Sequence, residues 1–400
     1  MLSIIVVHPS LNRVGGAERV CLEFIKALKE KGYNVTLVTI ERTQWYLVDR
    51  GFGQRIRPTR EQHLVERLPE NNLLQSFLIS LLFPLMLLKA RSRSCILVNT
   101  YGDLVESIAD ISYVNAIPMR IAHRFSQSGL PDSFLWRLAY VTYDVWLKLI
   151  ERNQNSPIVL TNSTFMQSIL KNLCGLDSKV IYPPVKICGT EPRSGQTQRR
   201  NLVVTVSRLR PGKNLGIIPQ IAKIVQEADF TIVGTTDKSS DETVSRLLQS
   251  IRALRVGDRV KLLLNQPYDK ISEVLSSATV FLHTQKTEAF GMAIVEAMSW
   301  GCVPVVPRAG GPWHDILGGT QGKYGYAYEN LEEAATTIGS IVANEELRKQ
   351  VSVRAKKHAK DFQDLQFDYQ MQKIIEALIE RKRLSYSRKS KAQGSHIPWS

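Results

Sequence analysis

Cysteine is scarce in this sequence of 400 residues, and its positions form no recognisable pattern. The five cysteines are dispersed, odd in number and free of the C-x-x-C spacing of zinc and redox sites: Cys21, Cys95, Cys174, Cys188 and Cys302. This usage indicates neither a disulfide framework nor a metal centre. It favours a reducing, cytoplasmic setting for the protein.

Several other signatures are missing. No complete G-x-G-x-x-G or Walker sequence occurs, and no Asp-x-Asp motif stands out. The N-terminal residues already read as a strand of the fold, so we expect no cleavable signal peptide. No apolar run reaches the about 20 residues of a typical transmembrane helix.

The chain carries an excess of positive charge, +15 at neutral pH, which indicates an anionic partner. Nucleic acid is disfavoured, because no binding motif is present and Lys and Arg are scattered rather than interleaved with stacking aromatics. An anionic membrane surface and a phosphorylated substrate remain as candidate partners.

The first 40 residues have the pattern of a βαβ unit. Leu2 to Val7 is apolar enough for a buried strand, Ala17 to Lys31 repeats apolar residues at helical spacing, and Asn34 to Ile40 is a second strand. Gly15 and Gly16 stand at the entrance of the helix. Without Cβ atoms they let backbone N–H groups approach a phosphate or sugar, although a Gly-Gly pair is also an ordinary turn.

A second strand followed by a basic loop begins near residue 203. The apolar run Val203 to Val206 leads into Ser207, Arg208 and, after a Pro-Gly pair, Lys213, before a helical stretch from Leu215 to Val225. Ligands of open α/β sheets bind at the C-terminal ends of the strands. A guanidinium and an ammonium there are suited to a diphosphate, although a solvated basic loop has the same composition.

Two glutamates frame a third strand-to-helix junction. The run Thr279 to His283 predicts a buried strand, Gly291 permits a tight turn, and Met292 to Ser299 predicts a helix ending before a glycine. Glu288 precedes this helix and Glu296 lies inside it. The helix N-terminus suits a pyrophosphate, and the carboxylates suit sugar hydroxyls, although helix capping alone also places acids there.

Length and apolar content (44%) support two α/β domains. A linker is predicted at Tyr182 to Val185 and the polar stretch that follows, from Gly189 to Asn201. We therefore predict an N-terminal domain over residues 1–185, a C-terminal domain over 186–362, a last helix over 363–384 that packs back, and a disordered tail over 385–400.

An apolar segment at residues 73–88 is flanked by Arg67 on one side and by Lys89, Arg91 and Arg93 on the other. At 16 residues with Pro84 inside, it is short for a membrane span. It is either a buried core helix or a helix that dips into the membrane interface, and the flanking cations favour the interface. A second stretch, 134–146, is rich in aromatics that suit either an interface or a core.

Taken in chain order, these residues resemble the retaining GT-B glycosyltransferases of family 4, and especially the dolichol-pathway GDP-mannose-dependent α-1,2-mannosyltransferases. The resemblance covers nearly the whole chain. Its motifs are His8-Pro9, Gly15-Gly16-Ala17-Glu18-Arg19, Asn162-Ser163, Tyr182-Pro183-Pro184-Val185, Ser207-Arg208 with Lys213-Asn214, Glu288 to Gly291 with Glu296, and Gly310-Gly311-Pro312 followed by Asp315.

The resemblance implies a GT-B fold of two Rossmann-like domains facing across a cleft, with an N-terminal acceptor-binding domain and a C-terminal nucleotide-sugar-binding domain. It implies that Arg208 and Lys213 bind the donor diphosphate and Glu296 the ribose. Glu288 holds the donor sugar together with the backbone of Phe290, Gly291, Met292 and Ala293. Gly15, Gly16 and Ser207 complete the donor site, and Glu288, Arg208 and Lys213 carry the catalysis.

In this family the donor phosphate itself deprotonates the acceptor hydroxyl on the same face, and catalysis is electrostatic stabilisation of the departing diphosphate. The resemblance therefore implies no cofactor and no metal. One departure concerns Asn115, where the family usually has a histidine. Asn115 and Tyr113 are the acceptor-side candidates. The other departure that we expect is the lack of the N-terminal membrane anchor that the eukaryotic relatives have.

Three functions follow from this interpretation. The leading one is transfer of mannose from GDP-mannose to a lipid-linked oligosaccharide or glycolipid at the cytoplasmic face of a membrane. The second is the same donor chemistry on a capsule, lipopolysaccharide or other acceptor. The third is a non-catalytic scaffold subunit of a membrane glycosylation complex, which only Asn115 favours.

Overall fold

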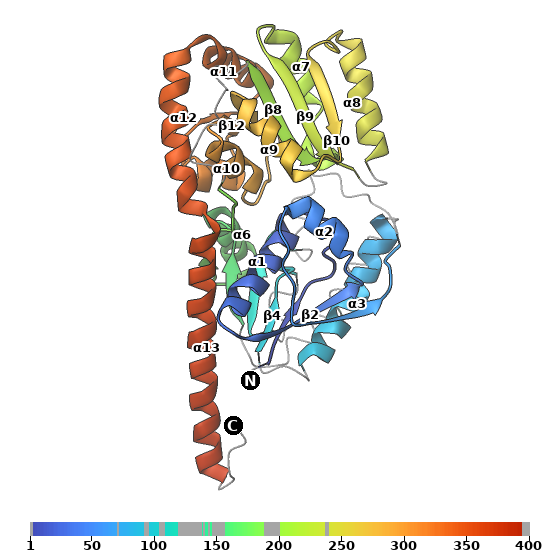
Figure 1. Ribbon diagram of the computed structural model, residues 1–400, viewed down its shortest axis with the longest axis vertical. Helices are drawn as coiled ribbons and strands as arrows, with labels where there is room; N and C mark the ends of the chain where they lie inside the picture. The colour runs from blue at the N-terminus through green and yellow to red at the C-terminus, as the bar shows by residue number, and fades with distance from the viewer. Residues whose placement is uncertain are drawn as a thin grey trace.

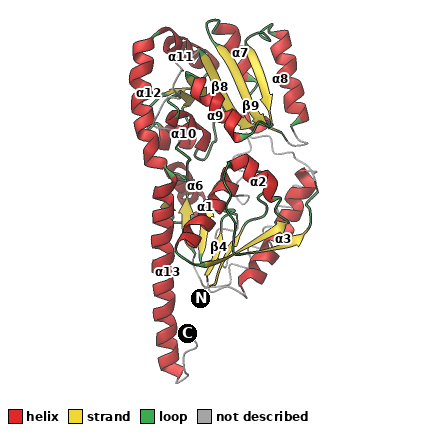
Figure 2. Cartoon of the chain, in the orientation of Figure 1, coloured by secondary structure: helices red, strands yellow, loops and turns green. Residues whose placement is uncertain are grey.

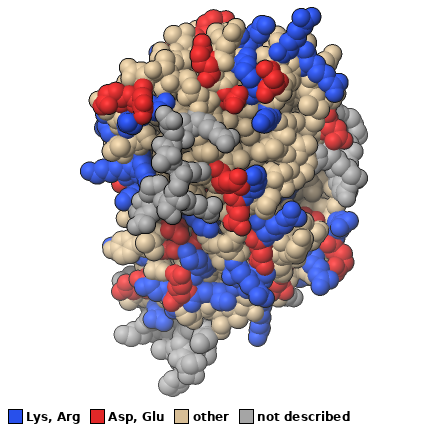
Figure 3. All heavy atoms as spheres, turned by 45° about the horizontal axis from the view of Figure 1, so that its top comes forward, with Lys and Arg blue, Asp and Glu red and all other residues tan. Residues whose placement is uncertain are grey.

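The computed structural model describes residues 3–69, 72–91, 96–103, 109–118, 138, 141–142, 145, 157–187, 201–236 and 240–393. Two α/β domains are stacked along the long axis of the molecule, and a last long helix runs beside the N-terminal domain (Figure 1). Helices cover both faces of each sheet (Figure 2). Acidic and basic side chains are interspersed over the face shown in Figure 3, where no single-sign patch accounts for the net charge.

The N-terminal domain is built on a parallel sheet with the strand order β3-β2-β1-β4-β5-β6-β7 in the described residues. Its strands are β1 (Ser3–Val7), β2 (Asn34–Glu41), β3 (Arg60–Val65), β4 (Ile96–Asn99), β5 (Ile111–Val114), β6 (Ile158–Thr161) and β7 (Lys179–Val180). The described helices are α1 (Gly16–Glu30), α2 (Trp45–Phe52), α3 (Asn72–Arg91) and α6 (Thr164–Cys174).

Both faces of this sheet are buried, as in most parallel sheets. Successive side chains of a strand point to opposite faces. Ile4 and Val6 of β1 therefore join the core under α1, while Ile5 and Val7 join the core under α3.

The C-terminal domain has a parallel sheet with the order β10-β9-β8-β11-β12-β13. Its strands are β8 (Leu202–Arg208), β9 (Asp229–Thr235), β10 (Val260–Leu264), β11 (Val280–Leu282), β12 (Val303–Pro307) and β13 (Tyr326–Tyr328). Its helices are α7 (Ile217–Ile224), α8 (Asp241–Ala253), α9 (Tyr268–Ser277), α10 (Met292–Ser299), α11 (Leu331–Ala343) and α12 (Glu345–Ala359), with short helical turns η2 (Pro211–Lys213), η3 (Pro312–Ile316) and η4 (Lys360–Phe362).

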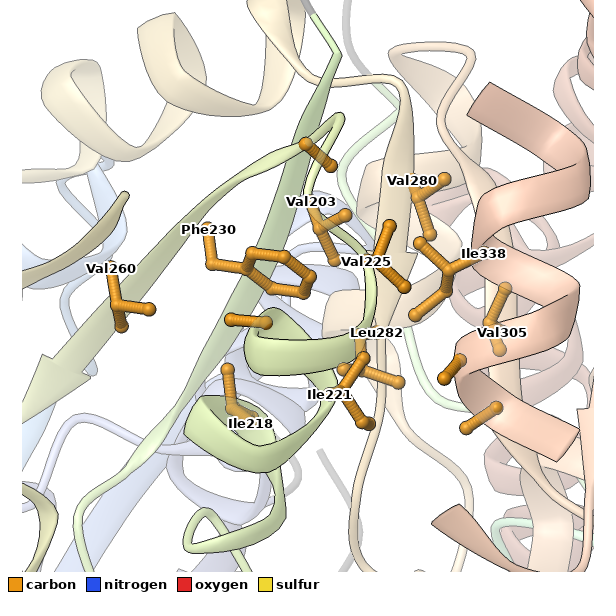
Figure 4. Close-up of a cluster of buried hydrophobic side chains, with 14 of the residues drawn as sticks. Val203, Ile218, Ile221, Val225, Phe230, Val260, Val280, Leu282, Val305 and Ile338 are labelled. Carbon is orange, nitrogen blue, oxygen red and sulfur yellow. The ribbon is translucent and has the colours of Figure 1, made fainter. Parts of the chain in front are cut away.

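One face of this second sheet packs under α7 and α11. Figure 4 shows Phe230 of β9 and Val280 of β11 beside Ile221 of α7 and Ile338 of α11. The opposite face, with Val204 and Phe281, packs against α10 and α12. The two predicted α/β domains are therefore present, and the predicted α/β fold class is confirmed.

Strand order reverses once in each sheet, between β1 and β4 in the first and between β8 and β11 in the second. Such switch points are where ligands bind in open α/β sheets, because the loops that leave the two strands diverge there. The loop after β1 contains Gly15, and the loops after β8 and β11 contain Lys213 and Glu288. These three predicted donor-site residues thus lie in loops that leave the strands of a switch point.

Helix α13 (Asp364–Gln393) leaves the C-terminal domain and returns along the N-terminal domain beside α1 (Figure 1). Phe367, on α13, stacks edge-on against Phe24 of α1 and against Tyr113 of β5. The sequence predicts disorder from residue 385, but the helix instead continues to Gln393. Residues 394–400 of the predicted tail lie outside the described residues.

Helix α3 has one side buried in the core and one apolar side exposed to solvent. The sequence analysis treats a core helix and an exposed apolar helix as alternatives. Phe83 and Leu87 are buried against the sheet, whereas Leu85 and Leu88 are 44% and 38% exposed. The helix runs through Pro84 to Arg91 and includes an 18-residue window of the length and hydropathy of a membrane span, 39% of it buried. That pattern is also found in core helices of soluble proteins. Most of the aromatic segment 134–146 lies outside the described residues.

Candidate functional site

Lys213 is held at the C-terminal end of β8 by the segment that follows β11. The Thr284 hydroxyl donates a hydrogen bond to the Lys213 carbonyl at 2.5 Å. The Lys213 ammonium donates to Gln285 Oε1 at 2.5 Å and to Glu288 Oε2 at 2.8 Å. The ammonium is therefore fixed at the switch point between two strands that are adjacent in the sheet.

Glu288 is ionised in this setting. Burial alone raises the pKa of a carboxyl group, but the charge and hydrogen bond of Lys213, together with the charges of His283 in its protonated form and of Arg208, outweigh burial and lower the pKa of Glu288 to about 2. His283 lies beside the pair, with Nε2 3.9 Å from Glu288 Oε2. Burial lowers the pKa of His283 to about 4, so the imidazole is neutral at physiological pH.

Arg208 ends β8 and faces the N-terminal domain. A Cβ atom added at Gly15 would lie 3.8 Å from the guanidinium carbon of Arg208. The hydroxyl of the preceding Ser207 donates to the Arg208 carbonyl at 3.2 Å. The entrance of α1 therefore lies within van der Waals range of the Arg208 guanidinium, so the two domains meet beside this cation.

The N-terminus of α10 lies next to these cations. Gly291 caps the helix with φ of +100°, a left-handed conformation that favours glycine. The first backbone N–H groups of a helix, here those of Met292 and Ala293, have no acceptor within the helix. The Phe290 side chain is 2% exposed and packs in the core, so only its backbone faces the site.

Gly310 and Gly311 explain the Gly-Gly-Pro motif. The Gly311 N–H donates to the Glu288 carbonyl at 3.0 Å. A Cβ atom at Gly311 would lie 2.0 Å from the Ala289 carbonyl oxygen, and one at Gly310 would lie 2.6 Å from that of Glu288. The two glycines therefore let this loop support the backbone that carries Glu288.

The N-terminal domain meets this site through α1. The Gly15 N–H donates to the Glu18 carboxylate at 2.9 Å, so one of the two glycine amides is already capped. Gly16 lies against the Met292 sulfur. Arg19, in the first turns of α1, forms a hydrogen-bonded ion pair with Glu296 of α10.

The two acceptor-side candidates differ in position. Tyr113 is fully buried, and its hydroxyl donates to the Ile181 carbonyl at 2.7 Å. This position does not support contact with an acceptor: Tyr113 is a core residue. Asn115 is partly exposed at the end of β5, where its amide donates to the Thr100 carbonyl at 2.7 Å.

Asp315 links the two domains beside the site. Its carboxylate accepts hydrogen bonds from the backbone N–H groups of Thr164 at 2.7 Å and Phe165 at 3.3 Å, at the N-terminus of α6. The neighbouring His314 ring stacks on Phe165. A residue of the C-terminal domain thus caps a helix of the N-terminal domain.

The sequence predicts that Arg208, Lys213, Glu288 and Glu296 share one site. The structure brings Lys213 and Glu288 into contact, with Arg208 close enough to act on Glu288, and it pairs Glu296 of α10 with Arg19 of the N-terminal domain. The sequence assigns no role to Arg19, His283, Gln285 or Asp315, which the structure adds. Arg19 and Asp315 lie inside the motifs that carry the resemblance, so those motifs could have identified them as site residues. For His283 and Gln285 the sequence offers no such signal beyond their nearness to Glu288.

Comparison with known proteins relates the chain to glycosyltransferases. Residues 190–358 match the family described as "Glycosyl transferases group 1". The chain is similar to proteins named "GDP-Man:Man(3)GlcNAc(2)-PP-Dol alpha-1,2-mannosyltransferase". The Dictyostelium discoideum protein is 25% identical over 300 residues, or 70% of this chain and 57% of the relative. The human protein is 27% identical over 242 residues, or 56% of this chain and 49% of the relative. The chain thus spans about half the length of these relatives.

Among solved structures, Anabaena Alr3699/HepE in complex with UDP and glucose has a TM-score of 0.70 at 19% identity, covering 94% of this chain and 100% of the other. Sucrose-phosphate synthase from Thermosynechococcus elongatus has a TM-score of 0.73 at 13% identity, covering 95% and 100%. At these identities the likeness concerns the fold. The predicted resemblance to GT-B glycosyltransferases, and the GT-B fold class, are confirmed.

Proposed function

We propose that this protein is a retaining glycosyltransferase that moves mannose from GDP-mannose to a lipid-linked oligosaccharide at the cytoplasmic face of a membrane. The observation that carries the proposal is the clustering of Lys213, Arg208 and Glu288 at the switch point of the second sheet, opposite the entrance of α1. The names of the curated relatives support the donor, the lipid-linked acceptor and the α-1,2 linkage.

The donor diphosphate binds between Arg208, Lys213 and the N-terminus of α10. Arg208 offers a planar fork and Lys213 a point charge, and the helix adds unpaired N–H groups and the positive end of its dipole. When a phosphate engages the Lys213 ammonium, Glu288 remains ionised next to it. Its oxygens then accept hydrogen bonds from the hydroxyls of the donor sugar, and Glu296 accepts from the ribose.

The reaction breaks the bond between the anomeric carbon and the diphosphate oxygen, and negative charge develops on the departing diphosphate. Fixed cations stabilise that charge most effectively when they are already in place. Lys213 meets this condition, because Thr284, Gln285 and Glu288 hold its backbone and its ammonium. The acceptor hydroxyl attacks from the face that the diphosphate leaves and gives its proton to a phosphate oxygen, so the α configuration is retained.

This proposal assigns no resident metal to the protein. The positive charge that a divalent cation supplies to a diphosphate in other enzymes is provided here by Arg208, Lys213 and the α10 N-terminus. The co-substrate is the nucleotide sugar itself, and nucleic acid is not a partner.

The acceptor lipid places the protein at a membrane, and α3 is the surface that we propose for contact with it. Leu85 and Leu88 present an apolar strip on the side of α3 that faces away from the sheet, and Lys89 beside them is exposed. An anionic leaflet attracts such a combination of apolar and cationic groups. Cytoplasmic, peripheral attachment then brings the acceptor to the N-terminal domain.

A transfer assay tests the proposal. The purified protein is incubated with radiolabelled GDP-mannose and a lipid-linked oligosaccharide ending in mannose, and the label in the organic phase is measured. Lys213→Met is the test variant, and Lys270→Met, which removes an exposed lysine paired with Glu273, is the control. We expect transfer by the wild type and the control and none by the Lys213 variant.

Transfer from GDP-mannose to a capsule or lipopolysaccharide precursor, but not to the lipid-linked oligosaccharide, would replace the proposed acceptor and keep the donor. No transfer of any sugar to any of these acceptors would favour the scaffold alternative.

A further inference from the structure

Arg19 and Glu296 are separated by 277 positions in the chain and meet across the domain interface. Arg19 comes from α1 of the N-terminal domain, and Glu296 from α10 of the C-terminal domain. Their side chains are only 9% and 12% exposed. A guanidinium that is this deeply buried is costly unless it is paired, so the pair is a built feature of the interface.

One N–H group of Arg19 is used by Glu296 Oε1. Within the described residues, Glu296 is the only side chain to which the guanidinium donates, and its other nitrogens are not among the fully buried unpartnered atoms. Arginine has five N–H donors in a fixed planar fork. The Arg19 side chain is 9% exposed, and with one N–H on Glu296 its fork has further N–H groups to offer a ligand that enters between the domains.

The N-terminus of α1 has fewer free backbone N–H donors for an anion than its two glycines suggest. Glu18 caps the Gly15 N–H and brings a negative charge to the helix N-terminus. Gly15 lies beside the Arg208 guanidinium, and Gly16 lies beside Met292, so the first turn of α1 borders the proposed diphosphate site. Among the described residues of that turn, Arg19 is the cation.

We propose that Arg19 is a donor-binding residue supplied by the N-terminal domain: it holds Glu296 toward the ribose and presents its remaining N–H groups to the diphosphate of the nucleotide. This inference rests on the proposed function and adds to it. The guanidinium binds a phosphate through its fork while one N–H stays on Glu296. A nucleoside diphosphate then touches both domains and stabilises their closed arrangement, whereas a nucleoside without phosphates reaches only Glu296.

The test compares the binding of guanosine, GMP and GDP to the full-length protein by calorimetry. In the wild type, GDP binds more tightly than guanosine. Arg19→Met removes the fork and the charge, and we expect it to weaken GDP binding by about tenfold or more, the usual effect of losing a charge-assisted hydrogen bond. Guanosine binding changes far less, so the preference for GDP over guanosine, measured as the ratio of their dissociation constants, falls by about the same factor.

Lys31→Met is the matched control, because Lys31 caps the opposite end of the same helix and pairs with Glu376. It removes the same charge about 20 Å away along the helix and leaves the ratio unchanged. Arg19→Gln keeps an N–H donor for Glu296 but no charge, and it serves if the methionine variant does not fold. It is expected to give the same fall in the preference for GDP.

Equal weakening of guanosine and GDP would overturn the inference, because Arg19 would then act only by positioning Glu296. Unchanged GDP binding would overturn it as well. Both results leave the proposed function standing, since the wild type still binds GDP. A wild type that binds none of guanosine, GMP and GDP would instead contradict the proposed function and the inference together.

Discussion

The Asp315 carboxylate accepts a hydrogen bond from the Thr164 backbone N–H at 2.7 Å, and this contact joins the C-terminal domain to the start of α6 in the N-terminal domain. Ser163 caps the same helix from within its own domain, through Met166 N–H at 3.0 Å. The first turn of α6 is thus held from both domains. Asp315 is therefore placed to fix how the domains meet beside the donor site.

Replacing Asp315 with alanine leaves two N–H groups of α6 without their carboxylate. Loss of a helix cap costs about 1–2 kcal/mol, so we expect the free energy of unfolding to fall by that amount. Turnover is expected to fall as well, because the orientation of the domains is loosened. Urea denaturation and transfer kinetics measure the two effects.

Asn330→Ala is the matched control for this change. Asn330 caps α11 through Glu333 N–H at 2.8 Å, within a single domain. The Asn330→Ala variant should show a similar fall in the free energy of unfolding and keep the turnover of the wild type. Equal turnover in the Asp315 and Asn330 variants would show that the Asp315 contact is only a helix cap.

Glu288 makes stability depend on pH in the acid range. Its pKa is about 2 in the folded protein and 4.5 when unperturbed, so its contribution is fully present above pH 4.5 and is lost as the pH falls toward 2. A difference of this size corresponds to about 3 kcal/mol. Urea midpoints at pH 3 and pH 6 should therefore differ less for Glu288→Gln than for the wild type. An identical pH dependence in both proteins would show that Glu288 is not held ionised by Lys213.

The two sides of α3 give opposite predictions. Leu85→Gln changes an exposed residue and should weaken sedimentation with anionic vesicles while the melting temperature stays near that of the wild type. Leu87→Gln changes a fully buried residue and should lower the free energy of unfolding by about 3 kcal/mol. If Leu85→Gln binds vesicles as the wild type does, α3 is not the membrane-contacting surface.

Gly311→Ala tests the support of the Glu288 backbone. The added methyl group would meet the Ala289 carbonyl oxygen at 2.0 Å, so the loop has to move. We expect reduced transfer activity with a smaller loss of stability than a core mutation produces. Gly339→Ala is the control, because nothing lies within 4 Å of a Cβ atom there. Wild-type activity in the Gly311 variant would exclude the close approach.

The sequence predicts best where local signals are strong. The bounds of α10, Met292–Ser299, follow from the glycines on either side, and they are confirmed. The Lys213 and Glu288 cluster is predictable because parallel strands bring their C-terminal ends to one edge. The Arg19–Glu296 pair is not, because no spacing rule connects residues so far apart in the chain.

Other differences have equally physical causes. Residues 385–393 are polar and basic, a composition shared by disordered tails and by exposed helices, and α13 continues through them. Tyr113 lies in a short strand whose two faces are both buried, so its position alone does not distinguish a core residue from a site residue. Pro84 does not end α3, although proline often ends helices.

The measurement that tests the donor site most directly is the shift in melting temperature of the purified protein with GDP and GDP-mannose, for the wild type, Lys213→Met and Lys270→Met. A ligand at 100 times its dissociation constant stabilises the native state by about 2.7 kcal/mol. We predict a clear rise for the wild type and the Lys270 variant and a rise lost or strongly reduced for the Lys213 variant. A rise of equal size in all three proteins, or no rise in any of them, would contradict the assignment of Lys213 and its neighbours as the donor-binding site.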